Sequence, residues 1–487
     1  MGAKGLFQTC AVVASLACAS AAGASDVTTA TTGTDAAATD TAAAPLNFGP
    51  GGTSTTRTNF FTYGADVGVG YSDNLSETST DKKSDEIVGV GVQLAGYEQS
   101  ARFVGAMLGD LEHLNYLQGT YSPEVIGNFG GYASYALVPE FLHWMAQDSF
   151  GQGVVDPFAS QAPANLENVN TITTGPTLTL PLNALTLLDL SARYSRVSYQ
   201  VSPLDSNDYG GALSLTHLFS ARSRLSFNLQ TQRYDYTNPI NPSYDQREAF
   251  VRYDVQGART RITLDVGYDQ IRGYQLNSNG PLARFAATRT IAEGSVISLS
   301  AGHDPSSTSE FLTQSQGVSG IGLQATPGRQ AATPFTNEYE TVGWSFNRRR
   351  TTLSITLSHY QQIFDGQSIL DQSISTAEAR VSRLVAPGWM VAVFGDYSKQ
   401  AFAQQPGNFT EEHGGVSVKW QLARKLAMSL QYDHFNRDSP VALYAFSENR
   451  LFLRLQYGSE AAVAGGGETT LLNTVSVDPF SIPMPTH

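Results

Sequence analysis

Residues 249–268, AFVRYDVQGARTRITLDVGY, decide the fold of this chain because they hold two alternating runs joined by a short polar break. Apolar side chains occupy every second position of the first run, at Ala249, Val251, Tyr253 and Val255. The alternation resumes after the break at Gly257-Ala258-Arg259, with Ile262, Leu264, Val266 and Tyr268. A period of two is that of an extended strand with two unlike faces. Two such strands joined by a tight polar turn predict an antiparallel hairpin.

The runs are long, and their polar face is charged. Ordinary strands have about five or six residues, whereas a strand that crosses a bilayer at a tilt needs about nine to eleven. Arg252, Asp254 and Asp265 lie on one face of the hairpin, and the Val, Leu and Tyr side chains lie on the other. This pattern predicts an all-β fold, a transmembrane antiparallel up-and-down β-barrel with a hydrated lumen and a lipid-facing exterior.

The same alternation recurs from Asn59 almost to the end of the chain. We count about 20 strands, and 18 is equally tenable because segments 282–290 and 295–303 alternate weakly. Connections between the runs are alternately short and long, as in bacterial barrels with short periplasmic turns and long outer loops. The expected short connections lie near Gln99, Pro139, Leu182, Ala221, Ala258, Ala292, Arg349, Pro387 and Arg424. Expected long connections include 72–84, 153–170, 304–335 and 435–447.

Composition supports a membrane barrel and excludes several other classes. The 487 residues are 15% charged and 41% hydrophobic, and no apolar run of about 20 residues follows residue 25, so a helical membrane protein is not expected. A formal net charge of −13 argues against nucleic-acid binding, which requires a basic face. The expected location is the outer membrane of a Gram-negative bacterium, in contact with lipid and lipopolysaccharide.

The termini have the composition of processed and flexible segments. Residues 1–24 predict a signal peptide, with Lys4, an apolar core and a small-residue cleavage site at Ala22-Gly23-Ala24. Both cysteines, Cys10 and Cys18, lie within it, so the mature barrel is expected to lack cysteine. A less favoured alternative is lipidation of Cys18. Residues 25–58 predict a flexible periplasmic lead, too short for the plug of a TonB-dependent receptor. The barrel is expected at 59–458 and a flexible tail at 459–487.

Charged residues that lie out of phase with the lipid-facing stripes are the candidate site. These residues are Asp189, Arg193, Arg252, Asp254, Asp265, Glu378, Arg380, Asp396, Lys419, Asp433 and Arg454. Mixed charge on an inner wall is typical of a hydrated channel. The alternative is that the charges pair across strands and fill the lumen, but about 20 strands enclose more space than side chains pack. The long connection 304–335 is a candidate constriction loop, and deleting residues 320–333 is then expected to raise conductance.

Catalytic and metal sites are weakly supported. The eight histidines show no ligand spacing, and Ser358-His359 is the nearest approach to a hydrolytic pair. His359 is in phase with the lipid-facing residues of its run, so a hydrogen-bonded histidine explains it better. Acidic segments 205–208 and 73–85 could hold calcium, but neither matches the EF-hand loop, and solvated surface acid is the simpler interpretation. We therefore expect no cofactor, no metal and no enzymatic activity.

Four segments resemble a family of outer-membrane barrels encoded beside exopolysaccharide and PEP-CTERM protein-sorting loci. They are YSDNL at 71–75, LVPEFL at 137–142, GQGVVDPF at 151–158 and NRLFL at 449–453. The resemblance implies a porin-like channel for polar solute, with exopolysaccharide as the exported chain and periplasmic export components as partners. The other functions considered are a structural or surface-anchoring barrel without through-flow and, with least support, an outer-membrane hydrolase.

Overall fold

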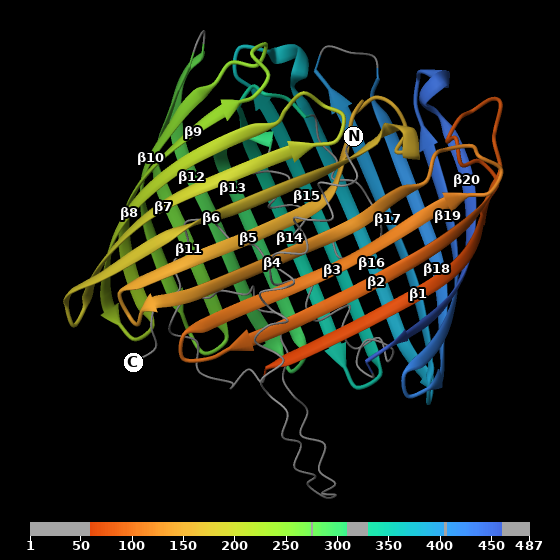
Figure 1. Cartoon of the computed structure of the whole chain (residues 1–487), viewed down its shortest axis with the longest axis horizontal. Coiled ribbons are helices and arrows are strands. Elements are labelled where there is room, and N and C mark those ends of the chain that lie inside the picture. Colours follow the sequence, from red (N-terminus) through yellow and green to blue (C-terminus); the bar gives the residue numbers. More distant parts are fainter. Residues whose placement is uncertain (1–58, 274–275, 309–329, 404–406, 460–487) are drawn as a thin grey trace, which may run out of the picture.

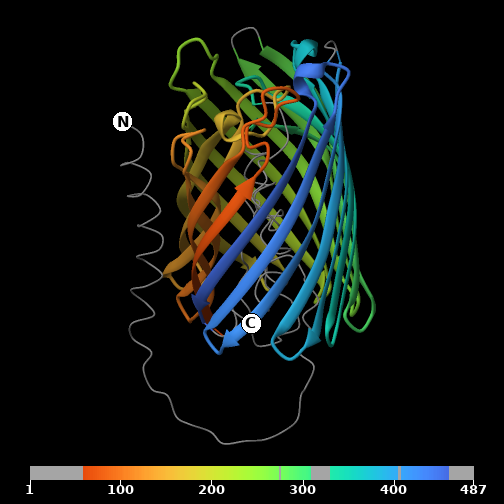
Figure 2. The same ribbon diagram turned by 90° about the vertical axis from the view of Figure 1, so that its right-hand side faces the viewer.

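The chain folds into one closed antiparallel β-barrel of 20 strands, seen from two sides in the computed structural model (Figures 1 and 2). The structure describes residues 59–273, 276–308, 330–403 and 407–459. The predicted signal peptide, lead and most of the predicted tail lie outside these ranges. The strands are β1 Phe60–Ser72, β2 Asp85–Gln99, β3 Phe103–Tyr116, β4 Glu124–Val138, β5 Leu142–Val154, β6 Leu166–Asn183, β7 Thr186–Tyr199, β8 Ser206–Ser220, β9 Ser223–Tyr236, β10 Tyr244–Gln256, β11 Thr260–Gly273, β12 Leu276–Ala292, β13 Ser295–Ser306, β14 Phe335–Arg348, β15 Thr351–Phe364, β16 Gln372–Ala386, β17 Trp389–Phe402, β18 Phe409–Ala423, β19 Leu426–Asp438 and β20 Phe446–Gly458.

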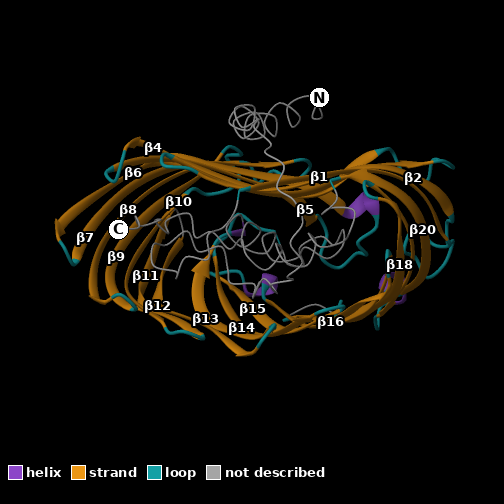
Figure 3. Cartoon of the chain, turned by 90° about the horizontal axis from the view of Figure 1, so that it is seen from below, coloured by secondary structure: helices purple, strands orange, loops and turns teal. Residues whose placement is uncertain are grey.

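Each strand pairs with its neighbours in sequence, and β20 pairs with β1 to close the sheet. The opening hairpin is β10–β11, with Arg252 opposite Asp265 and Val251 opposite Val266. Closure pairs Val67 with Leu455, so the described sheet has no free edge. The prediction of an up-and-down barrel is confirmed, and the strand number is 20. Seen from below, the barrel is flattened, with two broad walls joined at narrow ends (Figure 3).

All nine predicted short connections are tight turns at one end of the barrel. The β4–β5 turn contains Pro139 and Glu140, whose φ of +68° lies in the left-handed region. Glycine holds the corresponding position of the β16–β17 turn, Gly388, at φ +77°, because a residue without Cβ adopts this region at little cost. The strands run further toward the opposite end than predicted, so two long connections are shorter than expected, 155–165 and 439–445.

In the described connections at the end opposite the tight turns there are three short 3-10 helices. They are η1 Pro163–Asn165, η2 Ser368–Leu370 and η3 Ala442–Tyr444. Among the residues that the structure describes, none of the helices has the length and apolar character that a membrane crossing requires.

Outward-facing side chains form an apolar band between two aromatic girdles. Val67, Val90 and Val266 are about half exposed, at 49%, 55% and 56%. Exposed aromatic residues near the tight turns are Phe61, Tyr63, Trp144, Phe219, Trp344, Trp389, Trp420 and Tyr457. Those near the opposite end are Tyr71, Tyr194, Tyr209, Tyr268, Tyr397 and Tyr432. An even-stranded closed barrel with an apolar band and two girdles is the architecture of bacterial outer-membrane proteins. The protein is therefore an outer-membrane barrel of a Gram-negative bacterium, with the tight turns in the periplasm.

Candidate channel lumen and mouth

The eleven predicted lumen residues all fall, in strand register, on the face opposite the exposed apolar stripe. Arg252, Asp265 and Arg284 form one rung across β10, β11 and β12. Arg252 donates from Nε and Nη2 to the two carboxylate oxygens of Asp265, both at 2.8 Å. Arg284 contacts Glu248 at 3.2 Å and Asp304 at 2.5 Å. The inner wall here is a ladder of alternating charge, and its bidentate geometry fixes the side chains against the sheet.

Other predicted residues are held against the wall by hydrogen bonds to neighbouring strands. Asp254 accepts hydrogen bonds from Arg224 at 2.9 Å and from Thr263 at 2.8 Å. Asp189 accepts one from Thr179 at 2.7 Å. Arg193 donates to the Pro176 carbonyl and the Thr177 hydroxyl, both at 2.7 Å. These groups line the wall, and their hydrogen bonds keep them from extending across the lumen.

A histidine missed by sequence reasoning joins two of the predicted carboxylates. His413 on β18 contacts Asp396 on β17 through Nδ1 at 2.7 Å and Asp433 on β19 through Nε2 at 3.1 Å. Its ring stacks on Phe435 with centroids 4.2 Å apart and an interplanar angle of 3°. An imidazole between two carboxylates donates from both nitrogens only when it is protonated, so this cluster favours a cationic histidine.

Three predicted residues complete the inner wall of the β16–β18 sector. Glu378 is exposed toward the interior and pairs in register with Asp396. The Arg380 guanidinium lies 5.2 Å from the centroid of Phe394, within the range of a cation–π interaction. Lys419 lies on the inner face of β18, opposite Met390 in register. This sector carries both signs of charge, like the β9–β13 sector.

Small residues let one arginine lie across the barrel seam. Arg454 on β20 reaches over β1 and β2 to Glu112 on β3, with Nη2 at 3.2 Å from Oε2. The positions beneath it are glycines: a Cβ on Gly68 would lie 2.8 Å from the arginine Cγ, and one on Gly89 would lie 2.3 Å from a Glu112 oxygen. Such distances are far below van der Waals contact. The glycines are therefore required for an ion pair that spans the closing strands.

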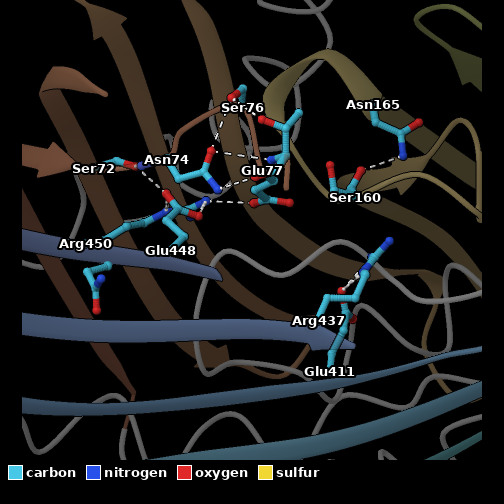
Figure 4. A network of polar contacts seen from close by, with 12 residues as sticks. Ser72, Asn74, Ser76, Glu77, Ser160, Asn165, Glu411, Arg437, Glu448 and Arg450 are labelled. Carbon is cyan, nitrogen blue, oxygen red and sulfur yellow. Dashed lines mark hydrogen bonds and ion pairs between the residues drawn. The ribbon is translucent and has the colours of Figure 1, made fainter. Parts of the chain in front are cut away.

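At the extracellular mouth, the β1–β2 connection, residues 73–84, carries Asn74 and Glu77, which lie beside Glu448 and Arg450 of β20 (Figure 4). Asn74 is fully buried, and its Nδ2 donates to the carbonyls of Thr78 and Ser447 at 2.9 and 3.0 Å. Leu75 packs in a buried apolar cluster with Ile87, Leu114, Tyr116 and Ile126. The amide thus fixes the turn while the leucine anchors it against the inner wall.

A buried ion-pair network holds this connection to β20. Arg450 donates to both oxygens of Glu448, at 2.5 and 2.7 Å, and to Glu77 at 2.8 Å. Ser72 also donates to Glu448, at 2.5 Å. Two carboxylates share one guanidinium here, and burial raises the pKa of Glu77 to about 7, with Glu448 adding to the effect and Arg450 opposing it. Its second oxygen is buried without a partner, so the protonated form suits the site.

A second connection, residues 155–165 between β5 and β6, reaches the opposite side of the mouth. Arg437 on β19 donates from Nη1 to the carbonyls of Ala159 and Phe158, at 2.7 and 3.3 Å, and pairs with Glu411 on β18 at 2.5 Å. The Phe158 ring lies 4.4 Å, centroid to centroid, from that of Phe402 on β17. Connection 155–165 therefore crosses the mouth and is anchored at its far rim. Sequence carried no signal for this contact, because its partners are 278 and 279 residues apart.

The other candidate sites have different environments. Ser358 contacts the Tyr360 hydroxyl at 3.0 Å on the inner face, whereas His359 points outward and contacts Ser375 at 2.8 Å. Adjacent strand residues face opposite sides, so these two form no hydrolytic pair. Asp73 and Asp205, which lie in the acidic segments considered for calcium, accept hydrogen bonds from the backbone of Asn449 and Tyr199. Within the described ranges, no three acidic or histidine side chains gather as a metal site.

The proposed constriction loop, 304–335, lies mostly outside the described residues, so its role stays a prediction. Its described ends are buried. Thr308 and Ala331 exchange two hydrogen bonds, at 2.8 and 3.1 Å. Gln330 donates to the carbonyl of Val154 at the end of β5, at 3.0 Å. The two ends of the loop therefore meet at the mouth.

Comparison with known proteins yields likeness of fold only. No protein-family model matches the chain, and no curated relative matches it. Among solved structures, it resembles a mutant of the ferric enterobactin receptor PfeA from Pseudomonas aeruginosa, with 9% identity and TM-score 0.43, covering 82% of this chain and 81% of that one. The siderophore receptor PirA from the same organism has 10% identity and TM-score 0.41, covering 85% and 84%. The FrpB iron transporter from Neisseria meningitidis has 10% identity and TM-score 0.41, covering 82% of each.

Proposed function

We propose that this protein is an outer-membrane channel for polar solutes. The observation that carries the proposal is the polar inner wall with two mixed-charge sectors, the Arg252–Asp265–Arg284 rung and the His413 cluster. Paired charges present hydrogen-bonding groups of both signs to a passing solute while keeping the wall close to neutral. A neutral polar chain would find partners along such a wall, and a small ion of either sign would meet no large barrier.

The finer proposal is export of exopolysaccharide in a PEP-CTERM-type system. Its support is the resemblance of four short segments and their use in this fold. YSDNL and NRLFL lie side by side where β1 and β20 close, and Asn74 and Arg450 hold the mouth connection through them. GQGVVDPF supplies the anchored Phe158. Segments with these roles would shape the exit of an exported chain. The periplasmic components that would deliver the chain are proposed on the same basis.

Planar-bilayer recording of the purified protein tests the channel. The wild type is expected to show stepwise conductance. The Arg252→Gln and Asp265→Asn double variant is expected to conduct with altered ion selectivity. A silent bilayer from a preparation that is folded by circular dichroism would refute through-flow. For the solute, deletion of the gene is expected to remove polysaccharide from the culture medium without affecting its synthesis in the cell. Unchanged secretion would refute polysaccharide export but would not contradict the general proposal of a channel for polar solutes.

A structural or surface-anchoring barrel is the second candidate, and one observation favours it. Two connections, 73–84 and 155–165, are bound at the mouth by arginines, the partly buried Arg450 and the buried Arg437. A barrel whose mouth is held closed would present its loops to the extracellular matrix and pass nothing. The same bilayer recording separates the two, because this candidate requires silence both in the wild type and after the mouth contacts are removed.

A further inference from the structure

The outer wall carries a local group of exposed arginines that neither the lumen nor the mouth uses. Arg196 on β7, Arg233 on β9, Arg247 on β10 and Arg272 on β11 occupy outward register positions and are exposed. We call these four residues the outer arginine patch. Register places them close together, because Arg233 lies opposite Asp245, which in turn lies opposite Arg272. Arg247 is one outward step below Asp245 on the same strand.

The patch sits at a defined height in the membrane. Arg196 follows Tyr194 by one outward step, Arg233 pairs in register with Tyr209, and Arg272 lies two outward steps above Tyr268. These tyrosines belong to the girdle at the loop end of the barrel. The arginines therefore lie at or just outside the girdle, at the level of the headgroups of the outer leaflet.

The patch keeps a net positive charge, because four arginines have two acidic neighbours on the outward face. Its acidic neighbours, Asp235 and Asp245, both contact Arg233, at 3.9 and 3.4 Å. Within the described part of the chain, Arg196, Arg247 and Arg272 make no ion pair. Other sectors at this height are acidic or mixed: Glu338 pairs with His303, and Glu340 and Glu412 face outward on β14 and β18. A positive surface confined to β7–β11 calls for an anionic partner at that depth.

We infer that the outer arginine patch binds the phosphate groups of a lipopolysaccharide molecule in the outer leaflet. Guanidinium groups bind phosphate through paired, charge-assisted hydrogen bonds. The tyrosines beneath the patch offer ring surface to the sugar and acyl region of the same molecule, and Tyr268 and Asn279 add polar contacts at the rim. A phosphorylated glycolipid fits both features, whereas free phosphate uses only the arginines. The inference depends on the orientation of the barrel and is independent of what passes through the lumen.

Binding of purified bisphosphorylated lipid A to the detergent-solubilised full chain tests this site, with native mass spectrometry counting retained lipid. The test variant replaces Arg196, Arg233, Arg247 and Arg272 by Gln. The matched control replaces Arg289, Arg348 and Arg383 by Gln, since these outward arginines lie at the periplasmic end. A second variant replaces the four patch arginines by Lys, which keeps the charge but not the paired geometry. Circular dichroism and the folded-form mobility on gels verify that each variant is a barrel.

The expected result is one retained lipid A per wild-type barrel, at least tenfold weaker binding in the Gln variant, intermediate binding in the Lys variant and unchanged binding in the control. Removing the phosphates from lipid A is expected to weaken its binding as much as the Gln variant does. Equal binding by the Gln variant and the wild type would overturn the inference. So would full retention of dephosphorylated lipid A, or displacement of lipid A by inorganic phosphate at equimolar concentration, which would identify free phosphate as the occupant.

Discussion

Freeing the 155–165 connection from the far rim of the mouth is expected to open the barrel. The perturbation is the double variant Arg437→Gln and Glu411→Gln, which removes the guanidinium without leaving its carboxylate partner unpaired. Arg437 has an exposed side-chain fraction of 1%, and its 2.7 Å hydrogen bond to the Ala159 carbonyl is made in a dry environment. The variant removes the charged donor on which this contact depends.

The size of the effect follows from that one good contact. A hydrogen bond to a charged group contributes about 1.5–3 kcal/mol, and 1.4 kcal/mol is about a factor of ten in an equilibrium constant. The ratio of docked to undocked connection is therefore expected to fall by about 10- to 150-fold. The Phe158–Phe402 contact remains and keeps part of the population docked, since an aromatic pair contributes about 0.5–1.5 kcal/mol beyond its area.

Hydrogen exchange of the amides in 155–165, with single-channel conductance on the same preparation, measures this change. Exchange is expected to accelerate at least tenfold in that segment alone, and conductance to rise. The matched control, Arg454→Gln with Glu112→Gln, removes an inner-wall ion pair that does not touch the connection, so its exchange there stays at the wild-type rate. Unchanged exchange in the test variant, or equal acceleration in the control, would refute the reasoning.

Three further predictions address the mouth, the outer wall and the seam. Because burial raises the pKa of Glu77 from 4.5 to about 7, its contribution to loop stability is complete below about pH 4.5 and is lost as pH rises through about 7. Exchange in 73–84, corrected for intrinsic rate, should then accelerate between pH 6 and 8 in the wild type but not in Glu77→Gln, and equal profiles would contradict this. Val266→Arg should lower the free energy of unfolding by about 2–4 kcal/mol, measured by urea unfolding from lipid vesicles. The control Val266→Leu should change this free energy little. Equal losses in the two variants would mean that Val266 does not face lipid. Gly89→Leu should displace Glu112 and destabilise the barrel by about 1–3 kcal/mol, which lowers the melting temperature of the folded form. Gly414→Ala is the control, because a Cβ there meets nothing within 4 Å. A melting temperature unaffected by Gly89→Leu would rule out steric contact at the seam.

The strand pattern was readable from sequence wherever lipid imposes it. The predicted connection 153–170 is too long, because β6 begins at Leu166, four residues before the predicted end of that connection. In this extension Glu167 and Asn168 are adjacent polar residues on opposite faces of the strand. Outside the membrane neither face needs to be apolar, so a strand can continue there without an alternating apolar pattern in its sequence. This is why the predicted turns were correct while two of the predicted long connections, 153–170 and 435–447, were too long.

Inward-facing residues can be predicted from sequence where the inner wall faces water, because they are polar there. The prediction fails where a loop packs against the wall, because the inward residues are apolar at those positions. The segment 101–117 has apolar residues in both registers, so alternation alone does not place its strand. The structure gives the cause: Leu114 and Tyr116 face inward and pack against Leu75 of the folded mouth connection. An apolar residue on the inner register therefore marks a position where a loop or another side chain fills the lumen. Charged residues in the same register mark positions where the inner wall is not covered. Their partners can be far away in sequence: Arg454 and Glu112 are 342 residues apart. The alternation in sequence thus indicates which residues share the face opposite the lipid-facing stripe, whereas their pairing depends on closure of the sheet and on the glycines at positions 68 and 89.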